Sequence, residues 1–271
     1  MGKTMPLMAG KQGLIMGVAN ERSIAWGIAK ALHSHGAALA FTYQGGEALG
    51  KRVRPLAESL DSDFVMEADV ASEDSLDTVF AALSQRWGRL DFVVHAIAFS
   101  DSRELKGKYL QTTRANFLRT LEISCYSFTD ICRRAVPLMT AGGSLLTLTY
   151  SGAERVMPHY NVMGVAKAAL EASVRYLAVD LGGDNIRVNA ISAGPIKTLA
   201  AYGIGDYHYI LKWNQLNSPL KRNVTIEDVG GAGLYLLSDL SVGVSGEIHH
   251  VDCGYHVVGM KAVDAPDISV V

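Results

Sequence analysis

The sequence Gln12-Gly-Leu-Ile-Met-Gly-Val-Ala-Asn-Glu-Arg-Ser-Ile-Ala-Trp-Gly27 joins an apolar segment to a helical pattern through a short turn. We expect a strand over Gln12 to Val18 and a helix over Ile24 to Ser34. Similar apolar, β-rich segments alternate with helical patterns to the end of the chain, as in a parallel sheet with helices on both faces. The predicted fold class is therefore α/β, a doubly wound parallel sheet of the Rossmann type.

The turn within this stretch has the features of a phosphate-binding site. Gly17 permits a backbone turn that a Cβ would obstruct, and Gly27 lets the helix lie close to the sheet. Amides at the start of such a helix face a pyrophosphate, so we expect Gly17, Ser23 and Ile24 to contact a dinucleotide cofactor. Ser23 could instead cap the helix. The full Gly-x-Gly-x-x-Gly fingerprint is absent, so the turn alone also fits an ordinary strand-to-helix connection.

The alternation of segments assigns elements along the whole chain. We treat residues 1–271 as one domain, because the length suits a single sheet and 49% of the residues are apolar. Further strands are expected at Ala37 to Tyr43, Phe64 to Glu67, Leu90 to His95, Ser144 to Thr149, Ile186 to Ile191 and Glu247 to Val251. Further helical regions are expected from near Glu73, with Ser72 as its N-cap, and over Arg114 to Met139, Tyr160 to Leu181 and Ile226 to Leu237.

The ends of the second and third strands carry side chains suited to the adenosine half of a dinucleotide. Gln44 stands where an acidic residue usually binds the ribose of NAD and a basic residue binds the phosphate of NADP. Its neutral amide bonds a hydroxyl and offers a phosphate no cation, which favours NADH. Asp69 is placed to bond the adenine amine, and Val70 to pack against the ring. Lys51, Arg52 and Arg54 on the next helix are interpreted as a solvated face and not as a phosphate site.

Small side chains follow the fourth strand, and a proline follows the sixth. Ala96-Ile97-Ala98 would let the cofactor ribose approach the backbone. Pro195 ends the sixth strand, and the backbone of Ile196 and Thr198 would bond the nicotinamide amide. His95 is interpreted as a core histidine and not a catalytic one.

Tyr160 and Lys167 are the pair on which the expected chemistry depends. Seven residues make two helical turns, so both side chains fall on one helix face, about 10 Å apart along the axis. A neighbouring ammonium favours the phenolate, which makes the hydroxyl a usable acid and oxyanion partner. Tyr150 follows the fifth strand at the edge where ligands bind in open parallel sheets. The spacing also arises by chance, so it has weight only inside a nucleotide-binding fold.

The composition excludes several classes of function. The formal net charge of −2 and pI near 6.4 give no basic surplus for nucleic acid or an anionic membrane. The three cysteines show no metal-ligand spacing, so we expect reduced thiols, no disulfide and no metal. No stretch of about 18 apolar residues and no signal-peptide pattern occurs. We expect a cytoplasmic protein that binds a small molecule or another protein.

The segment from Leu199 to Asn217 is rich in aromatic residues and too long for an ordinary connector. Gly203 and Gly205 ease alternative backbone conformations, whereas the aromatic side chains need apolar surface that a bound chain would supply. We interpret residues 199–217 as a substrate-binding lid. Tyr207 and Ile210 are its expected substrate contacts.

Taken together, these motifs resemble those of the bacterial NADH-dependent enoyl-[acyl carrier protein] reductases, a divergent branch of the short-chain dehydrogenase/reductase superfamily. The resemblance extends over residues 7–258. Ordinary members of the superfamily carry Tyr-x3-Lys, and no tyrosine of this chain has a lysine four positions on. The matching residues are Gly17 with Ser23-Ile24-Ala25 and Gly27, Asp69-Val70, Tyr150, Tyr160-Asn-Val-Met-Gly164 with Lys167, and Ala193-Gly-Pro-Ile-Lys-Thr-Leu-Ala200.

The resemblance implies a homotetramer that reduces trans-2-enoyl thioesters on acyl carrier protein with NADH, in fatty acid elongation. Tyr160 and Lys167 would be the catalytic pair, and Tyr150 competes with Tyr160 as donor to the enolate oxygen. Ala96 and Ala98 stand where relatives commonly have Ser and Gly, so Ala98 adds a methyl beside the acyl pocket. The implied substrate contacts are Ala98, Tyr150, Tyr160, Tyr207 and Ile210.

The lid would also lie near the portal used by acyl carrier protein, an acidic partner. Relatives carry a basic cluster there, whereas this chain has Gly205, His208 and Tyr209. Lys212, Lys221 and Arg222 are the expected substitutes, and docking should be weak and salt-sensitive.

Two other functions compete with this one. A carbonyl reductase of the ordinary superfamily type would need Tyr-x3-Lys, which is missing. A non-catalytic, dinucleotide-sensing protein would usually have lost Tyr160 or Lys167, and both are present.

Overall fold

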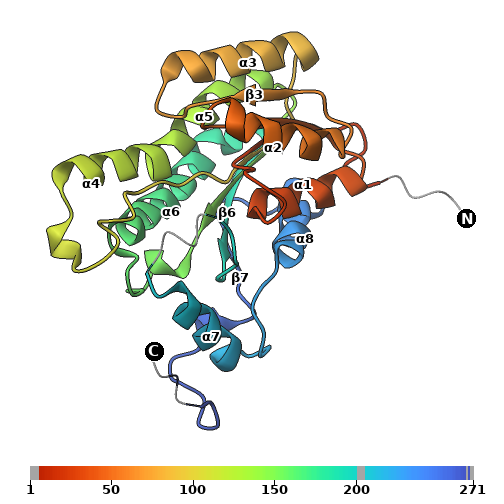
Figure 1. Cartoon of the computed structure of the whole chain (residues 1–271). Coiled ribbons are helices and arrows are strands. Elements are labelled where there is room, and N and C mark those ends of the chain that lie inside the picture. Colours follow the sequence, from red (N-terminus) through yellow and green to blue (C-terminus); the bar gives the residue numbers. More distant parts are fainter. Residues whose placement is uncertain (1–5, 200–204, 267, 269–271) are drawn as a thin grey trace, which may run out of the picture.

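The computed structural model describes residues 6–199, 205–266 and 268. Within them, one parallel sheet has seven strands in the order β3-β2-β1-β4-β5-β6-β7 (Figure 1). The predicted doubly wound fold is therefore confirmed. The strands are β1 (Gln12–Met16), β2 (Ala38–Tyr43), β3 (Val65–Glu67), β4 (Phe92–His95), β5 (Gly143–Thr149), β6 (Ile186–Ala193) and β7 (Ile248–Val251).

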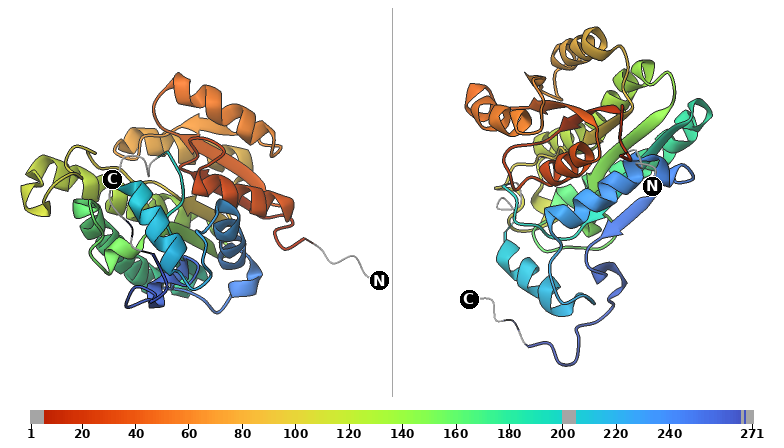
Figure 2. Two further views of the ribbon diagram at one scale, coloured as in Figure 1. Left: turned by 60° about the horizontal axis from the view of Figure 1, so that its bottom comes forward. Right: turned by 90° about the vertical axis from the view of Figure 1, so that its right-hand side faces the viewer.

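Helices cover both faces of this sheet (Figure 2). One face is covered by α1 (Ile24–Ser34), α2 (Glu47–Glu58) and α8 (Ile226–Leu237). The other face is covered by α3 (Glu73–Trp87), α5 (Ser127–Ala135) and α6 (Asn161–Leu181), with α4 (Arg114–Leu121) beside α6. Helix α7 (Tyr207–Asn217) belongs to neither layer, and the right-hand view of Figure 2 shows it below the sheet and its covering helices.

Side chains alternate between the two faces along each strand, because successive residues of a strand point to opposite sides. Ile15 and Phe41 pack among residues of α1, α2 and α8. Their chain neighbours Leu14 and Ala40 pack among residues of α3, α5 and α6. All four are fully buried, so the apolar runs read as strands are strands covered on both sides.

The observed boundaries differ from the predicted ones in two instructive places. The first strand ends at Met16 and not at Val18, since Gly17 turns the backbone with φ of +100°. The predicted helical region over Arg114 to Met139 is not one regular helix. A π-helical segment, Glu122–Tyr126, separates α4 from α5, and a 3-10 turn that contains Pro137 follows. The predicted N-cap of α3 is confirmed, because Ser72 Oγ accepts a bond from the amide of Ser75 at 3.3 Å.

Gly27 allows a close helix contact, though not the one predicted. A Cβ on Gly27 would lie 2.2 Å from the backbone oxygen of Ile226, in α8, and a Cβ on Gly230 would lie 2.6 Å from the oxygen of Gly27. The expectation that Gly27 brings α1 onto the sheet is therefore wrong. Glycines on both helices instead let the backbones of α1 and α8 touch.

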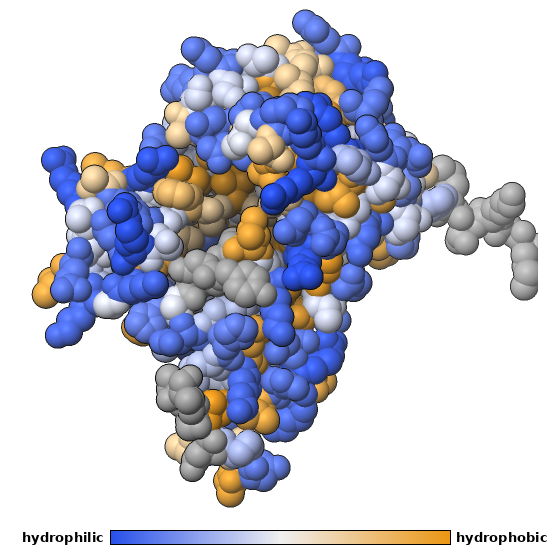
Figure 3. All heavy atoms as spheres, viewed as in Figure 1, coloured by the Kyte–Doolittle hydropathy of each residue, from blue (hydrophilic) through white to orange (hydrophobic). Residues whose placement is uncertain are grey.

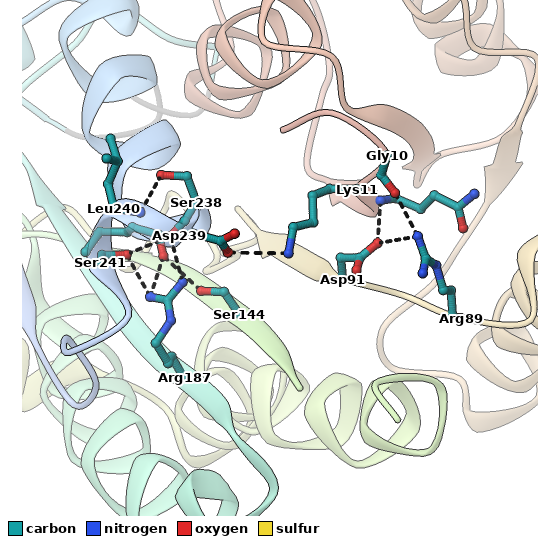
Figure 4. Close-up of polar contacts among 12 residues, drawn as sticks. Gly10, Lys11, Arg89, Asp91, Ser144, Arg187, Ser238, Asp239, Leu240 and Ser241 are labelled. Atoms are coloured by element: carbon teal, nitrogen blue, oxygen red, sulfur yellow. Dashed lines mark hydrogen bonds and ion pairs between the residues drawn. The ribbon is translucent and has the colours of Figure 1, made fainter. Parts of the chain in front are cut away.

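Polar side chains fasten the amino-terminal edge of the sheet (Figure 4). From β6, the Arg187 guanidinium donates to the carbonyls of Leu236 and Ser238, at 2.8 and 3.1 Å. These carbonyls belong to the end of α8, where helical carbonyls need outside donors. Lys11, just before β1, pairs with Asp239 at 3.4 Å. The Arg187 and Lys11 charges at this edge thus have structural partners within the protein.

Candidate active site

A cavity of about 500 Å³ opens at the carboxyl ends of β4, β5 and β6. Figure 3 shows a hollow with apolar walls in the middle of this face. Residues after each of these strands line it, and the start of α7 lies across it. The predicted site residues that it collects are Ile24, Ala96, Ile97, Ala98, Tyr150, Tyr160, Lys167, Pro195, Ile196, Thr198, Tyr207 and Ile210.

The other predicted residues do not line this cavity but lie at the carboxyl ends of β1, β2 and β3 or just beyond them. They are Gly17, Ser23, Gln44, Asp69 and Val70. The direction of the strand order reverses between β1 and β4, and open parallel sheets bind dinucleotides at such a position. The arrangement fits an extended ligand that runs from the β3 side into the cavity.

Gly17 lets the turn after β1 pass close to the backbone that follows β4, at the crevice where the strand order reverses. A Cβ there would lie 2.1 Å from the backbone oxygen of Ala96, and the φ of +100° suits glycine alone. The Ser23 hydroxyl accepts bonds from the amides of Ala19 and Asn20, at 3.0 and 3.1 Å. It makes no capping bond to α1, so the capping alternative is wrong. Ser23 instead fixes the turn that precedes the helix.

On the adenosine side, the structure adds a residue that the sequence did not single out. Gln44 is exposed, and the Glu67 carboxylate accepts a bond from the amide of Gly46 at 2.8 Å. A negative charge therefore lies beside the loop that follows β2. Asp69 accepts a bond from the amide of Ala71 at 3.0 Å, which fixes the start of the connection to α3. Glu67 was missed because it ends a strand pattern and carries no motif of its own.

The seven-residue spacing brings Tyr160 and Lys167 to one cavity, as predicted. Tyr160 occupies the N-cap position of α6, without a capping bond from its side chain, and Lys167 lies two helical turns further along. Both are buried, with 7% and 5% of their surface exposed. The Lys167 ammonium donates to the carbonyl of Leu148 at 2.7 Å, and burial lowers its pKa to about 8. The bond to β5 fixes the position of the ammonium in the cavity lining.

The expected effect of Lys167 on the Tyr160 phenol is wrong for this structure. Burial raises the pKa of Tyr160 well above its ordinary value, and Tyr150 and Glu171 act in the same direction. Desolvation of the phenolate outweighs any help from the neighbouring ammonium. Tyr160 is therefore a neutral phenol that keeps its proton, which is the form required of a donor.

Tyr150 stands next to Tyr160 in the same cavity. Their rings meet edge to face with centroids 5.1 Å apart, and burial raises the pKa of Tyr150 to about 12. Gly152 makes room for this contact, because a Cβ there would lie 2.4 Å from the Tyr160 ring. Both phenols thus keep their protons, and the geometry leaves each available as a donor.

Much of the cavity wall was not foreseen. It is apolar, and its members occur in β5, in the loops after β4 and β5, and in α6, where nothing in the sequence separates them from core residues. Their presence indicates a ligand with a hydrocarbon portion. They include Phe99, Leu105, Leu148, Met157 and Met163.

His95 is a core residue, as predicted. Its ring is fully buried and bonds Thr147 Oγ1 at 3.0 Å and Ser127 Oγ at 2.9 Å. Burial lowers its pKa to about 3. Both ring nitrogens are hydrogen-bonded to hydroxyl groups, and His95 does not line the cavity. The imidazole is therefore not available to a ligand there.

This histidine should make stability depend on pH. The unfolded chain binds a proton at His95 below about pH 6.5, whereas the folded protein resists it until about pH 3. The free energy of unfolding should therefore decrease as the pH is lowered from about 6.5 to about 3. His95 contributes at most about 1.4 kcal/mol of this decrease per pH unit. Urea unfolding at stepped pH should show a flatter profile for His95→Gln than for the parent. His208→Gln, at an exposed position, is the control and should keep the parent slope.

Among the described residues, no helix is long and apolar enough to cross a membrane, and no group of histidine, cysteine and acidic side chains could hold a metal ion. The three cysteines are unpaired. The cavity is lined by phenols, the Lys167 ammonium, backbone groups, apolar side chains and the hydroxyl side chains of Ser100, Ser102, Thr149 and Thr198.

Comparison with known proteins gives consistent results. The family model described as enoyl-(acyl carrier protein) reductase matches residues 17–256. Enoyl-[acyl-carrier-protein] reductase [NADH] 1 of Rhizobium meliloti is 68% identical over 270 residues, which cover 100% of this chain and 99% of that protein. The corresponding enzyme 2 of the same organism is 66% identical over 96% of each chain.

Solved structures agree with the curated relatives. The enoyl-(acyl-carrier-protein) reductase of Anaplasma phagocytophilum, in complex with NAD, has a TM-score of 0.93 and 62% identity, covering 98% of this chain and 99% of that one. The Bacillus cereus enzyme, solved with NADP+ and an indole naphthyridinone, has a TM-score of 0.92 and 51% identity, covering 94% and 100%. The fold, the seven-residue Tyr-Lys spacing and these matches together show that the chain belongs to the enoyl-(acyl carrier protein) reductase family.

Proposed function

We propose that the protein reduces trans-2-enoyl thioesters carried by acyl carrier protein, with NADH as the hydride donor, in the fatty acid elongation cycle. The observation that supports this most strongly is the meeting of Tyr160 and Lys167, seven residues apart, in one apolar cavity beside a dinucleotide crevice. Relatives with this name match the whole chain. A cytoplasmic location belongs to the same proposal and is supported by the three unpaired cysteines.

The crevice fits a dinucleotide. The space above Gly17 would be filled by any Cβ, so only a backbone without a side chain leaves room for a pyrophosphate. Gly17, Ser23 and Ile24 would hold the phosphates, and Gln44, Asp69 and Val70 the adenosine. Ribose and nicotinamide contacts would come from Ala96, Ile97, Lys167, Pro195, Ile196 and Thr198. When bound, NADH supplies a hydride to the β-carbon of the enoyl thioester.

Hydride addition gathers negative charge on the thioester oxygen, and the cavity must meet that charge. Tyr160, a neutral phenol held by its packing, would donate a hydrogen bond and then its proton to the enolate. A fixed donor of this kind contributes about 3–4 kcal/mol to the transition state. Lys167 would hold the ribose hydroxyls beside Tyr160. Tyr150 is the alternative donor, and the apolar wall, with Ala98, Tyr207 and Ile210, would take the acyl chain.

The direct test follows NADH oxidation with crotonyl thioester and with a β-ketoacyl thioester. The proposal expects turnover of the enoyl compound. Turnover of the keto compound alone would indicate a carbonyl reductase. NADH binding without turnover of either would indicate a sensing protein.

We expect kcat/KM to favour NADH over NADPH by about tenfold or more, equivalent to about 1.4 kcal/mol. Gln44 offers no cation to a 2′-phosphate, and the Glu67 carboxylate beside Gly46 repels one. Specificity constants for both cofactors measure this, and Glu67→Gln should narrow the preference while the control Glu58→Gln should not. A parent preference for NADPH would mean that a base such as Arg52 reaches the ribose.

We also propose that residues 199–217 form a lid over the acyl chain. Tyr207 and Ile210 of α7 line the cavity, and the Tyr207 hydroxyl donates to the carbonyl of Ile196. Residues 200–204, with Tyr202 and Gly203, lie outside the described part of the chain. Hydrogen exchange of the backbone amides of residues 205–217 should be slower when cofactor and acyl ligand are both bound than in the free protein.

Docking of acyl carrier protein needs a revised set of cations. Arg222 makes a bidentate ion pair with Asp228, and the Lys221 ammonium donates to the carbonyl of Leu216 at 3.0 Å. Both cations are therefore already bound to groups of this protein, which makes them less available to a partner. Lys212, exposed on α7, becomes the main cation proposed for an acidic partner.

Assembly into a homotetramer is part of the proposal. Large apolar or aromatic side chains are exposed on the outer side of α4 to α6, where they would be covered by a second copy. Their exposure ranges from 55% for Leu118 and 56% for Tyr126 to 77% for Tyr176 and 81% for Val179. Sedimentation equilibrium would test assembly, and Tyr176→Glu should weaken it.

A further inference from the structure

We propose that His159 and Asp206 are positioning residues that clasp the start of α7 to the loop carrying Tyr160, and so set the affinity for the acyl substrate. The part of this inference that concerns substrate rests on the proposed function. The part that concerns the clasp rests on the geometry alone.

The two side chains meet directly. His159 Nε2 lies 2.9 Å from Asp206 Oδ2, and 32% and 49% of the two side chains are exposed. The His159 Nδ1 atom is buried and has no hydrogen-bond partner among the described residues. The contact with Asp206 is therefore the polar anchor of this ring.

The contact between His159 and Asp206 joins the two sides of the cavity. His159 lies between Pro158 and Tyr160 in sequence, and both of these line the cavity. Asp206 directly precedes Tyr207, which also lines it and begins α7. Each partner is adjacent in sequence to a residue that lines the cavity, so a shift of either partner would also move that lining residue.

The backbone at both partners is unusual. His159 has φ of +56° and Asp206 φ of +54°, in the left-handed region. Such residues persist only where their surroundings hold them, and they gather at functional sites. The ring of His159 also packs on Gly205, where a Cβ would lie 3.1 Å from the imidazole. Glycine at 205 thus lets the α7 segment approach the ring closely.

The test uses His159→Asn, Asp206→Asn and the double variant, because asparagine, like histidine and aspartate, tolerates the left-handed region. A partly exposed ion pair contributes up to about a fivefold change in an equilibrium. We expect each single change to raise the KM for an enoyl thioester about three- to fivefold, with kcat and NADH affinity within about twofold of the parent. The double variant should lose no more than either single variant, since both remove the same contact.

A second pair in the molecule supplies the control. His33 Nε2 lies 3.0 Å from Asp61 Oδ2, and Asp61 also has a left-handed φ of +56°. Neither residue lines the cavity. Asp61→Asn should leave KM and the exchange of α7 amides unchanged, which separates the clasp from a general loss of stability.

Hydrogen exchange of α7 without substrate makes the clasp testable apart from the reaction. Amides of Tyr207–Asn217 should exchange up to about fivefold faster in Asp206→Asn than in the parent. Exchanging the partners, with His159→Asp and Asp206→His together, should restore protection. Equal α7 exchange in parent and Asp206→Asn would overturn the clasp. Faster exchange with an unchanged KM would overturn its role in substrate binding, and faster exchange without any enoyl turnover would leave the clasp standing while the proposed function fails.

Discussion

Replacing Tyr160 by phenylalanine is expected to lower turnover of an enoyl thioester by about 100-fold or more, with NADH affinity nearly unchanged. The change removes the hydroxyl that would meet the enolate, and it keeps the ring that packs against Tyr150 and Gly152. Steady-state kinetics with saturating NADH and a cofactor titration by fluorescence measure the two quantities. Lys167→Ala should weaken NADH binding as well, because it removes the ammonium that would hold the ribose.

Two comparisons give this prediction its meaning. Tyr150→Phe deletes the competing phenol, so the tyrosine whose loss costs more in kcat is the principal donor. If Tyr160→Phe and Lys167→Ala lost NADH affinity equally, the division of roles between donor and cofactor anchor would be wrong. A nearly normal kcat in Tyr160→Phe would transfer the donor role to Tyr150.

Gly17→Ala should be the most damaging small substitution in the crevice. The new methyl would lie 2.1 Å from the oxygen of Ala96, and φ of +100° is unfavourable for any other residue. Overpacking and left-handed strain together should cost about 3 kcal/mol of stability. The melting temperature should fall by about 6–12 °C. NADH binding should be lost even at temperatures where the variant is folded, because the turn must move into the space of the pyrophosphate.

The control for this substitution is Gly231→Ala. Gly231 lies in α8, and a Cβ there would meet no atom within 4 Å. Alanine is the better helix former, so this variant should be as stable as the parent or more stable, by up to about 1 kcal/mol. Calorimetry on both variants and isothermal titration with NADH decide the matter. Retention of full NADH affinity in Gly17→Ala would remove the crevice from the cofactor site.

The sequence predicted what periodicity and spacing control. Short apolar runs separated by helical patterns identified the strands, because a strand buried on both faces of a parallel sheet must be apolar along its length. The spacing from Tyr160 to Lys167 specified a shared helix face, and both side chains do line one cavity. Ser72 was correctly taken as the N-cap of α3, because capping depends on neighbours within one turn.

What the sequence could not supply depends on contacts between distant segments. Gly27 packs against Ile226 near the other end of the chain, and no local pattern encodes that. The proton affinity of Tyr160 follows from burial, which outweighs the neighbouring lysine. The first two errors came from considering each residue only with its sequence neighbours. Arg222 is a different case: its partner Asp228 is only six residues away, and the turn before α8 brings the two side chains together.

The close contact between α1 and α8 also has a consequence for synthesis of the protein. Helix α1 leaves the ribosome long before α8 is synthesised, so the nascent chain carries an apolar stripe on α1 that stays uncovered until α8 is present. Contacts between such distant segments slow folding and expose aggregation-prone surface in the meantime. A chain released early, before Ile226–Leu237, would present Ala25, Ile28 and Leu32 to the solvent and would be a substrate for chaperones and proteases. Quality control of this protein is thus expected to depend on whether α8 has been made, and α8 comes later in the chain than both Tyr160 and Lys167.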